Sequence, residues 1–79
     1  MEVEVGKMYE LELEDKKVLF GIMYAFEKGR NKDVYSLMIY SHKGAFEFPV
    51  RRETLNRWVK ENKLKEVEAE FALQQILGE

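Results

Sequence analysis

Residues 45–62, AFEFPVRRETLNRWVKEN, decide the fold class because the spacing of their apolar residues changes part-way along. Apolar residues first alternate with other residues, which is the two-residue period of a β-strand. They then recur three and four residues apart, which is typical of a helix that packs by one face. The alternating residues are Phe46, Phe48 and Val50, and the helical ones are Leu55, Trp58 and Val59. A strand that leads straight into a helix predicts an α+β fold.

Three further strands are predicted before this stretch, separated by short polar turns. Tyr9–Glu14 alternates apolar and acidic residues, so its acidic side chains are expected to face water. Those side chains are Glu10, Glu12 and Glu14. Val18–Phe26 and Val34–Ser41 are apolar on both faces, as in central strands. Pro49 cannot donate a ladder hydrogen bond, which favours an edge position for Ala45–Val50. Four strands joined by short turns predict an antiparallel meander.

The second predicted strand is expected to place five large side chains on one face of the sheet: Val18, Phe20, Ile22, Tyr24 and Phe26. Gly21 within this strand indicates a bulge, a bend or a close approach of another backbone. Both faces of the two central strands need cover. Either each helix covers one face, or a dimer partner covers the second, so a homodimer is one of the expected arrangements.

The segment after the helix fits two descriptions. Alternation with glutamates favours a strand that would close a small SH3-like barrel, and it involves Val67, Ala69 and Phe71. Helical spacing is also present, at Ala69, Ala72, Leu73, Ile76 and Leu77. We expect an extended stretch near Leu64–Glu68 and then a helix to Leu77, while the sequence leaves open whether residues 65–77 are strand, helix or both. The expected fold is one α+β domain over residues 1–79, a four-stranded antiparallel meander followed by one or two helices.

Composition excludes several classes of function. The 79 residues suffice for a single domain. The chain has no cysteine, so disulfides, thiolate metal sites and thiol nucleophiles are excluded. The single histidine, His42, lies in a turn-like stretch without the further histidines that a metal site needs. Nucleotide-binding and serine-hydrolase motifs are missing as well, so we expect a protein that is not an enzyme and uses no cofactor.

The sequence also gives expectations about location and source. No stretch approaches the roughly 18 apolar residues of a membrane span, and the N-terminus has no hydrophobic signal region. We therefore expect a cytoplasmic protein without membrane contact. The abundance of Glu and Lys, together with the absence of cysteine, is typical of proteins from hot environments.

Positive charge is concentrated between Arg51 and Lys65. This segment holds six basic and two acidic residues, a net charge of +4, whereas the whole chain carries −2. Arg51 and Arg52 stand at the start of the predicted helix, where the helix dipole disfavours cations and favours anions. Beside free backbone N–H groups, two guanidinium groups would form a site for a phosphate or a carboxylate. The alternative is that both arginines are solvated or pair with Glu47 or Glu53.

The segment Arg51–Leu64 resembles the recognition helix of excisionase and MerR-type winged helix-turn-helix domains. The matching residues are Thr54, Leu55, Trp58, Val59 and Leu64. The resemblance implies that the side chains facing DNA are Arg52, Asn56, Arg57 and Lys60. The chain departs from the family before this segment, because Gly44–Val50 is predicted as a strand where the family has its first helix. No clear wing hairpin follows it either.

We therefore expect a small regulatory protein that binds nucleic acid through its basic helix. The candidate contact residues are Arg51, Arg52, Asn56, Arg57, Lys60 and Lys63. The sequence pI of about 5.5 argues against unspecific coating of DNA, which needs a strongly basic surface. The alternative function is a protein-binding inhibitor or adaptor, such as a virus- or plasmid-type accessory protein that blocks a host factor. Such a protein would use its acidic strands or a sheet edge.

Aromatic residues in the strands offer a further way to bind single-stranded nucleic acid, by stacking on its bases. The residues are Tyr24, Phe26, Tyr35, Tyr40 and Phe48. Most of them lie in strands that are apolar on both faces, so packing in the core is the favoured interpretation.

Overall fold

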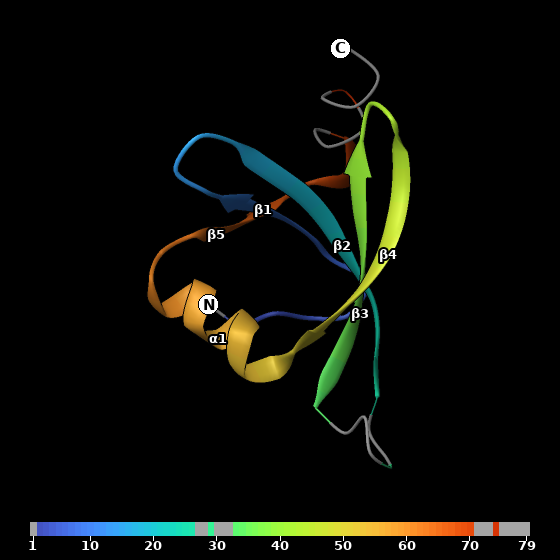
Figure 1. Ribbon diagram of the computed structural model, residues 1–79, viewed down its shortest axis with the longest axis vertical. Helices are drawn as coiled ribbons and strands as arrows, with labels where there is room; N and C mark the ends of the chain where they lie inside the picture. Colours follow the sequence, from blue (N-terminus) through green and yellow to red (C-terminus); the bar gives the residue numbers. More distant parts are fainter. Residues whose placement is uncertain (1, 27–28, 30–32, 71–73, 75–79) are drawn as a thin grey trace.

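Five antiparallel strands and the helix α1 make up the computed structural model over the residues it describes, which are 2–26, 29, 33–70 and 74 (Figure 1). In chain order the elements are β1 (Met8–Glu12), β2 (Lys17–Phe26), β3 (Val34–Ser41), β4 (Gly44–Arg51), α1 (Arg52–Lys60) and β5 (Leu64–Val67). The predicted α+β class with an antiparallel meander is confirmed.

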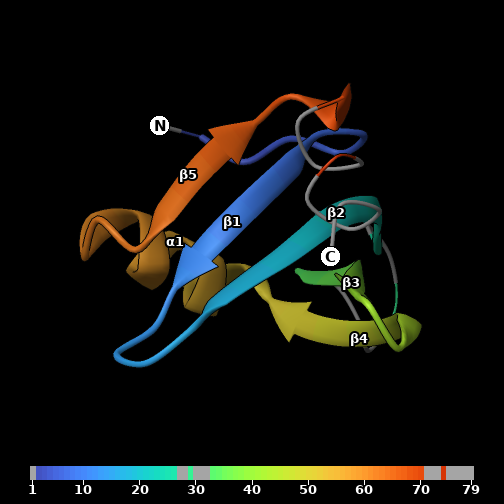
Figure 2. The ribbon, with the colours of Figure 1, turned by 90° about the horizontal axis from the view of Figure 1, so that it is seen from above.

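The sheet has the strand order β4-β3-β2-β1-β5, so the chain returns after α1 to the free side of β1 (Figure 2). Leu64 pairs with Leu11, and Val67 pairs with Met8. These pairs confirm the extended stretch predicted near Leu64–Glu68. The sheet is open, because β4 and β5 form its two edges, and the described strands do not close into a barrel.

The helix predicted after β5 falls mostly outside the described residues. Ala69, Glu70 and Gln74 have helical backbone geometry. The other positions between residue 71 and Leu77 lie outside the described part of the chain. The role of this helix as a cover for the second face of the sheet stays a prediction.

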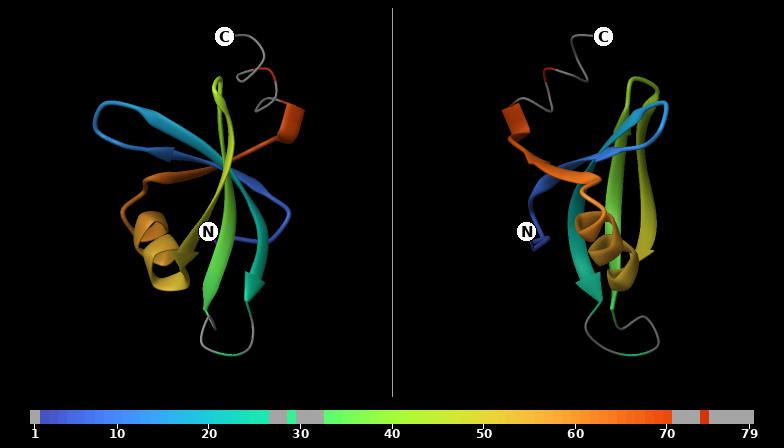
Figure 3. Two further views of the ribbon diagram at one scale, coloured as in Figure 1. Left: turned by 45° about the vertical axis from the view of Figure 1, so that its right-hand side comes forward. Right: turned by 90° about the vertical axis from the view of Figure 1, so that its left-hand side faces the viewer.

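One hydrophobic cluster holds the sheet and the helix together. Its buried members are Val3, Tyr9, Leu11, Phe20, Ile22, Leu37, Leu55 and Leu64. They come from the N-terminal segment, four strands and α1, so the core lies on the face of the sheet against which α1 packs (Figure 3). Leu55 is fully buried, and the Trp58 ring meets Phe20 edge-on with 6.4 Å between the ring centroids. The packing face predicted for the helix is confirmed.

A β-bulge in β2 corrects the predicted distribution of side chains between the two faces. The register of β2 against β3 shifts between Ile22 and Tyr24, which makes Met23 the extra residue. Alternation reverses there, so Phe20 and Ile22 face the core while Tyr24 and Phe26 lie on the opposite, outer face. The prediction that all five large side chains of this strand share one face was therefore wrong for Tyr24 and Phe26.

Gly21 is not the site of this irregularity. It pairs in regular register with Met8 of β1 and Met38 of β3. A Cβ atom at this position would meet side-chain atoms of Met8 and Tyr40 at 3.7 Å, which is ordinary van der Waals contact. The bulge lies two residues later, where no glycine marks it in the sequence.

Asn62 turns the chain just after α1, which ends at Lys60. Its φ is +58°, the left-handed conformation that asparagine adopts more readily than most residues. The N–H groups of Asn62 and Lys63 donate to the carbonyl oxygens of Val59 and Trp58, at 3.0 and 2.9 Å. This Schellman motif satisfies two of the last helical carbonyls and turns the chain into β5.

Tyr9 ties the N-terminal segment to the core. Its side chain is fully buried, and its hydroxyl oxygen accepts a hydrogen bond from the Glu4 backbone N–H at 2.9 Å. Burial raises the pKa of the Tyr9 phenol above its ordinary value, because the phenolate would lose its hydration. The stability that Tyr9 contributes is therefore present below a pH of about 10 and is lost as the pH rises through the raised pKa.

Leu55→Ala should lower the free energy of unfolding by about 2 to 5 kcal/mol, because removal of a fully buried side chain leaves a cavity. Urea unfolding followed by circular dichroism measures the loss. The matched control is Asn56→Ala, which changes the neighbouring exposed residue and should alter stability by less than about 0.5 kcal/mol. Equal stability of the two variants would contradict the packing of α1.

Tyr9→Phe should be less stable than the unmodified chain by about 0.5 to 1.5 kcal/mol at neutral pH, because it loses the hydrogen bond from Glu4. The difference should shrink over the pH range above about 10, since only the unmodified chain loses the stability contributed by the Tyr9 hydroxyl as its raised pKa is passed. Urea unfolding at a series of pH values measures both effects. Parallel curves over this range would show that the hydroxyl is not buried.

Candidate nucleic-acid interface

α1 turns one face to the core and the other to solvent. Leu55, Trp58 and Val59 pack into the hydrophobic cluster. The exposed side chains opposite them include four of the predicted contact residues, which we call the basic face of α1: Arg52, Asn56, Arg57 and Lys60. Burial of the apolar side chains thus fixes which side chains α1 presents to a partner.

Arg52 has a partner that the sequence did not predict. Its Nη1 lies 3.3 Å from Oδ1 of Asp33, and its backbone N–H donates to the Asp33 carbonyl oxygen at 2.7 Å. The guanidinium also lies over the Tyr35 ring, 5.7 Å from the centroid. Both charged side chains are about half exposed, so the ion pair adds little stability. Among the described residues, Arg52 forms no ion pair with Glu47 or Glu53, the partners considered from the sequence.

The start of α1 is a shallow pocket of mixed charge. Its volume is about 280 Å³, and it is lined by Asp33, Arg51, Arg52, Glu53 and Asn56. Arg51 is the N-cap residue in an extended conformation, and no side chain caps the helix. The structure brings Arg51, Arg52 and Asn56 together at this pocket. It also adds two carboxylates, which offset the attraction of the two guanidinium groups for a phosphate.

The remaining predicted residues lie near the other end of α1. Arg57 and Lys60 stand in its last turn, where the negative end of the helix dipole favours cations. Neither forms an ion pair within the described part of the chain. Lys63, which follows the helix, lies 3.3 Å from the Glu61 carboxylate. Like Arg51, Arg57 and Lys60 form no ion pair among the described residues, and unlike Arg51 they do not line the pocket that holds the Asp33 and Glu53 carboxylates.

Aromatic side chains are more exposed than the sequence predicts. Tyr24 and Phe48 are exposed rather than packed in the core, while Phe26, Tyr35 and Tyr40 are half-buried. By register, Phe48 lies on the face that holds the core, and Tyr24 and Phe26 lie on the outer face. These residues therefore do not form a single stacking platform. The sequence favoured core packing for Phe48, but β4 is an edge strand and Phe48 is exposed.

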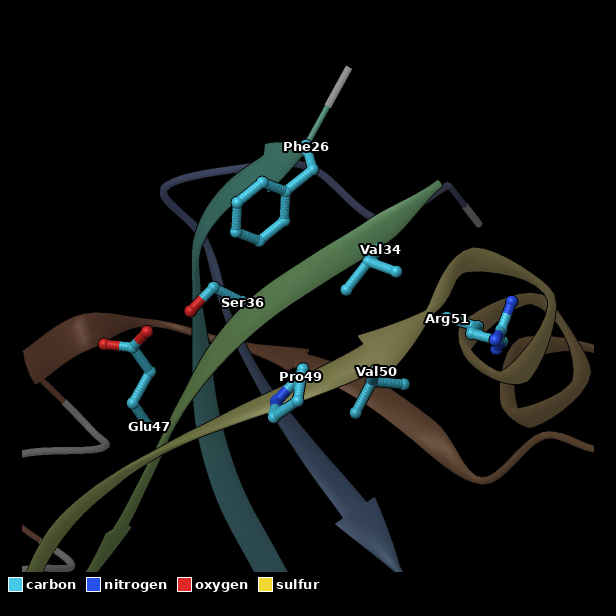
Figure 4. Close-up of a pocket in the computed structure, with 7 residues that line it drawn as sticks. All are labelled: Phe26, Val34, Ser36, Glu47, Pro49, Val50 and Arg51. Carbon is cyan, nitrogen blue, oxygen red and sulfur yellow. The ribbon is translucent and has the colours of Figure 1, made fainter. Parts of the chain in front are cut away.

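An open pocket of about 490 Å³ is formed by β2, β3 and β4 (Figure 4). Its lining residues are Phe26, Val34, Ser36, Glu47, Pro49, Val50 and Arg51. Ser36 is buried, and its Oγ has no hydrogen-bond partner among the described residues.

The prediction that the acidic side chains of the first strand face water is wrong for Glu10. Its side chain is only 13% exposed and lies 3.7 Å from Lys17 Nζ, whereas Glu12 and Glu14 are exposed as predicted. Glu10 lies opposite Lys65 of β5, a neighbour that the alternation of β1 alone could not indicate. The acidic residues of β1 thus form a smaller exposed patch than expected.

Neither a metal-binding cluster nor a membrane-spanning helix is found among the described residues. No group of three or more His, Asp or Glu side chains is placed to hold a metal ion in the part of the chain that the structure describes. His42 is exposed in the turn between β3 and β4. Among the described residues, no helix is long and apolar enough to cross a membrane.

Comparisons of the chain with protein-family models, with curated proteins and with solved structures found no match. The resemblance of Arg51–Leu64 to a winged helix-turn-helix recognition helix therefore stays a prediction. In the structure α1 follows directly from strand β4.

Proposed function

We propose that this chain is a non-enzymatic regulatory protein that binds nucleic acid through the basic face of α1. The observation that supports the proposal best is the position of Arg57 and Lys60. Both are exposed, neither is engaged in an ion pair within the described residues, and the burial of Leu55 holds them outward. Lysine and arginine side chains held in this way make phosphate contacts.

The distribution of charge supports the same partner. The segment Arg51–Lys65 carries +4, and the rest of the chain sums to −6. A polyanion would attract α1 and repel the acidic strands, so the charge orients the protein during encounter. Only a few phosphate contacts are available on one nine-residue helix, which implies moderate affinity and a strong dependence on salt.

Asn56 supplies the basic face of α1 with a side chain that can recognise a base. It is the uncharged member of the basic face, and it lies beside Arg57. An asparagine carboxamide can bind both N6 and N7 of adenine in the major groove, while neighbouring cations hold the phosphates. This role does not require the first helix of a winged helix-turn-helix domain. It requires only that α1 reach the groove.

We also propose that the fold is related to the small SH3-like barrels. A meander of four strands, a short helix and a fifth strand that returns to β1 is an order consistent with an open relative of the small SH3-like barrels. In such an arrangement, α1 lies outside the strands and its solvent face remains accessible.

Reversing charge on the basic face should abolish binding without unfolding the protein. The variant is Arg57→Glu with Lys60→Glu, and the measurement is a fluorescence anisotropy titration of labelled duplex DNA and RNA at several salt concentrations. The unmodified chain should bind at low salt, and its log–log slope should correspond to about 0.9 for each phosphate contact on DNA. The double variant should show no binding at the same concentrations.

The matched control is Lys16→Glu with Lys17→Glu, which changes net charge by the same amount in the turn before β2 and at its first residue. A circular dichroism spectrum checks that loss of the Lys17–Glu10 ion pair leaves the fold of this control intact. This control should retain most of the binding of the unmodified chain. Equal loss in both double variants would indicate a response to net charge alone. Failure of the unmodified chain to bind any DNA or RNA probe at low salt would reject the proposed function.

The second candidate function is a protein-binding inhibitor or adaptor, and the exposure of Phe46 and Phe48 on an edge strand favours it. Large exposed aromatic residues are enriched at protein interfaces. If this function is correct, capture of a partner should survive nuclease treatment and reversal of Arg57 and Lys60. It should be lost in Phe48→Ser.

A further inference from the structure

β4 is a sheet edge that carries two exposed phenylalanines. Phe46 is 57% and Phe48 is 54% exposed, and both lie on the face of the sheet that holds the core. The other edge, β5, is four residues long with Lys65 and Glu66 at its centre, features that discourage pairing with another strand. β4 is eight residues long, so it is the edge better suited to extend the sheet.

The position of Pro49 indicates which backbone groups of β4 point to the free edge. Successive residues of an antiparallel strand turn their N–H and C=O groups alternately toward one neighbour and toward the other. Proline has no N–H, so Pro49, opposite Ser36, takes a position whose groups point away from β3. By the same alternation, Ala45 and Glu47 also turn their N–H and C=O groups to the free edge.

We propose that two copies of the chain join through β4, with the two strands antiparallel and Phe46 on the two-fold axis. In this register Ala45 of each copy lies opposite Glu47 of the other. The free N–H and C=O groups of these residues form four hydrogen bonds across the axis. The two Phe46 side chains meet directly, and each Phe48 lies opposite Gly44 of the second copy.

A two-fold axis at Phe46 suits this edge better than an axis at Glu47 or at Ala45. An axis at Glu47 would set two carboxylates opposite each other and bring Pro49 into the ladder without an N–H to donate. An axis at Ala45 would pair β4 with the turn before Gly44. The axis at Phe46 pairs five residues within β4. It also lets each Lys43 side chain reach the Glu47 carboxylate of the second copy, so opposite charges meet at both ends of the interface.

A second copy fits this edge because the edge is complementary to itself. The donors and acceptors of Ala45 and Glu47 are placed symmetrically about Phe46, as a two-fold interface requires. An extended peptide from another protein would have to supply apolar side chains over Phe46 and Phe48. A second β4 places its own Phe46 directly opposite Phe46 and diagonal to Phe48.

The pairing places the two helices a defined distance apart. Arg51 lies five residues from the axis in each copy, so the two helix starts are separated by the rise of ten strand residues, about 33 Å. This spacing is close to one turn of duplex DNA, about 34 Å, which separates the half-sites bound by many dimeric regulators. The consequence for DNA rests on the proposed function, whereas the dimer itself does not.

Cysteine cross-linking tests the register, because the chain has no cysteine of its own. In Phe46→Cys the two new residues form a non-hydrogen-bonded pair with Cα atoms about 4.5 Å apart, within reach of a disulfide. In the matched control Phe48→Cys, the two cysteines are four residues apart along the strands, about 13 Å, which is too far. Oxidation without nucleic acid should convert Phe46→Cys to a covalent dimer much faster than Phe48→Cys.

A second pair of variants keeps both phenylalanines. Glu47→Pro removes an N–H that faces the free edge, and Glu47→Ala keeps it. Light scattering should give twice the 9.4 kDa mass for the unmodified chain and for Glu47→Ala, and the monomer mass for Glu47→Pro with an unchanged circular dichroism spectrum. A monomeric unmodified chain, equal cross-linking of the two cysteine variants, or a folded dimeric Glu47→Pro would each overturn the proposal. These measurements contain no nucleic acid, so their failure is distinct from failure of the proposed function.

Discussion

Burial of Leu55 determines how α1 packs against the sheet and which of its side chains face solvent. This side chain joins α1 to a core built from β1, β2, β3 and β5, and it orients the helix so that Arg57 and Lys60 face solvent. The left-handed turn at Asn62 then leads the chain to the free side of β1, where Leu64 enters the same core. The same cluster thus stabilises the sheet and determines which polar surface the helix presents.

Local periodicity predicted the elements well because each pattern reflects which face of its own segment is buried. The switch of period near Val50 located α1. Periodicity could not locate the bulge at Met23, because a strand that is apolar on both faces looks alike before and after an inserted residue. The pairing of β5 with β1 joins residues that are far apart in the sequence. Local periodicity therefore could not predict that the Glu10 side chain is mostly buried.

The candidate site shows the same division between local and non-local information. Helical spacing identified the exposed basic residues of α1, since their positions follow from the buried ones. The carboxylate that pairs with Arg52 comes from Asp33, which reaches the helix start because Val34 lies opposite Arg51 in the sheet. The exposure of Phe46 and Phe48 likewise follows from the edge position of β4. Because strand order places a carboxylate beside the start of α1, the basic residues of its last turn are the better candidates for contact with a polyanion.

Contact between the solvent face of α1 and nucleic acid can be followed through backbone amide chemical shifts during a titration with duplex DNA at low salt. We expect the largest shift changes between Asn56 and Lys60, with small changes in β1. Largest changes in β1 or along β4, or no changes at all at low salt, would contradict this expectation.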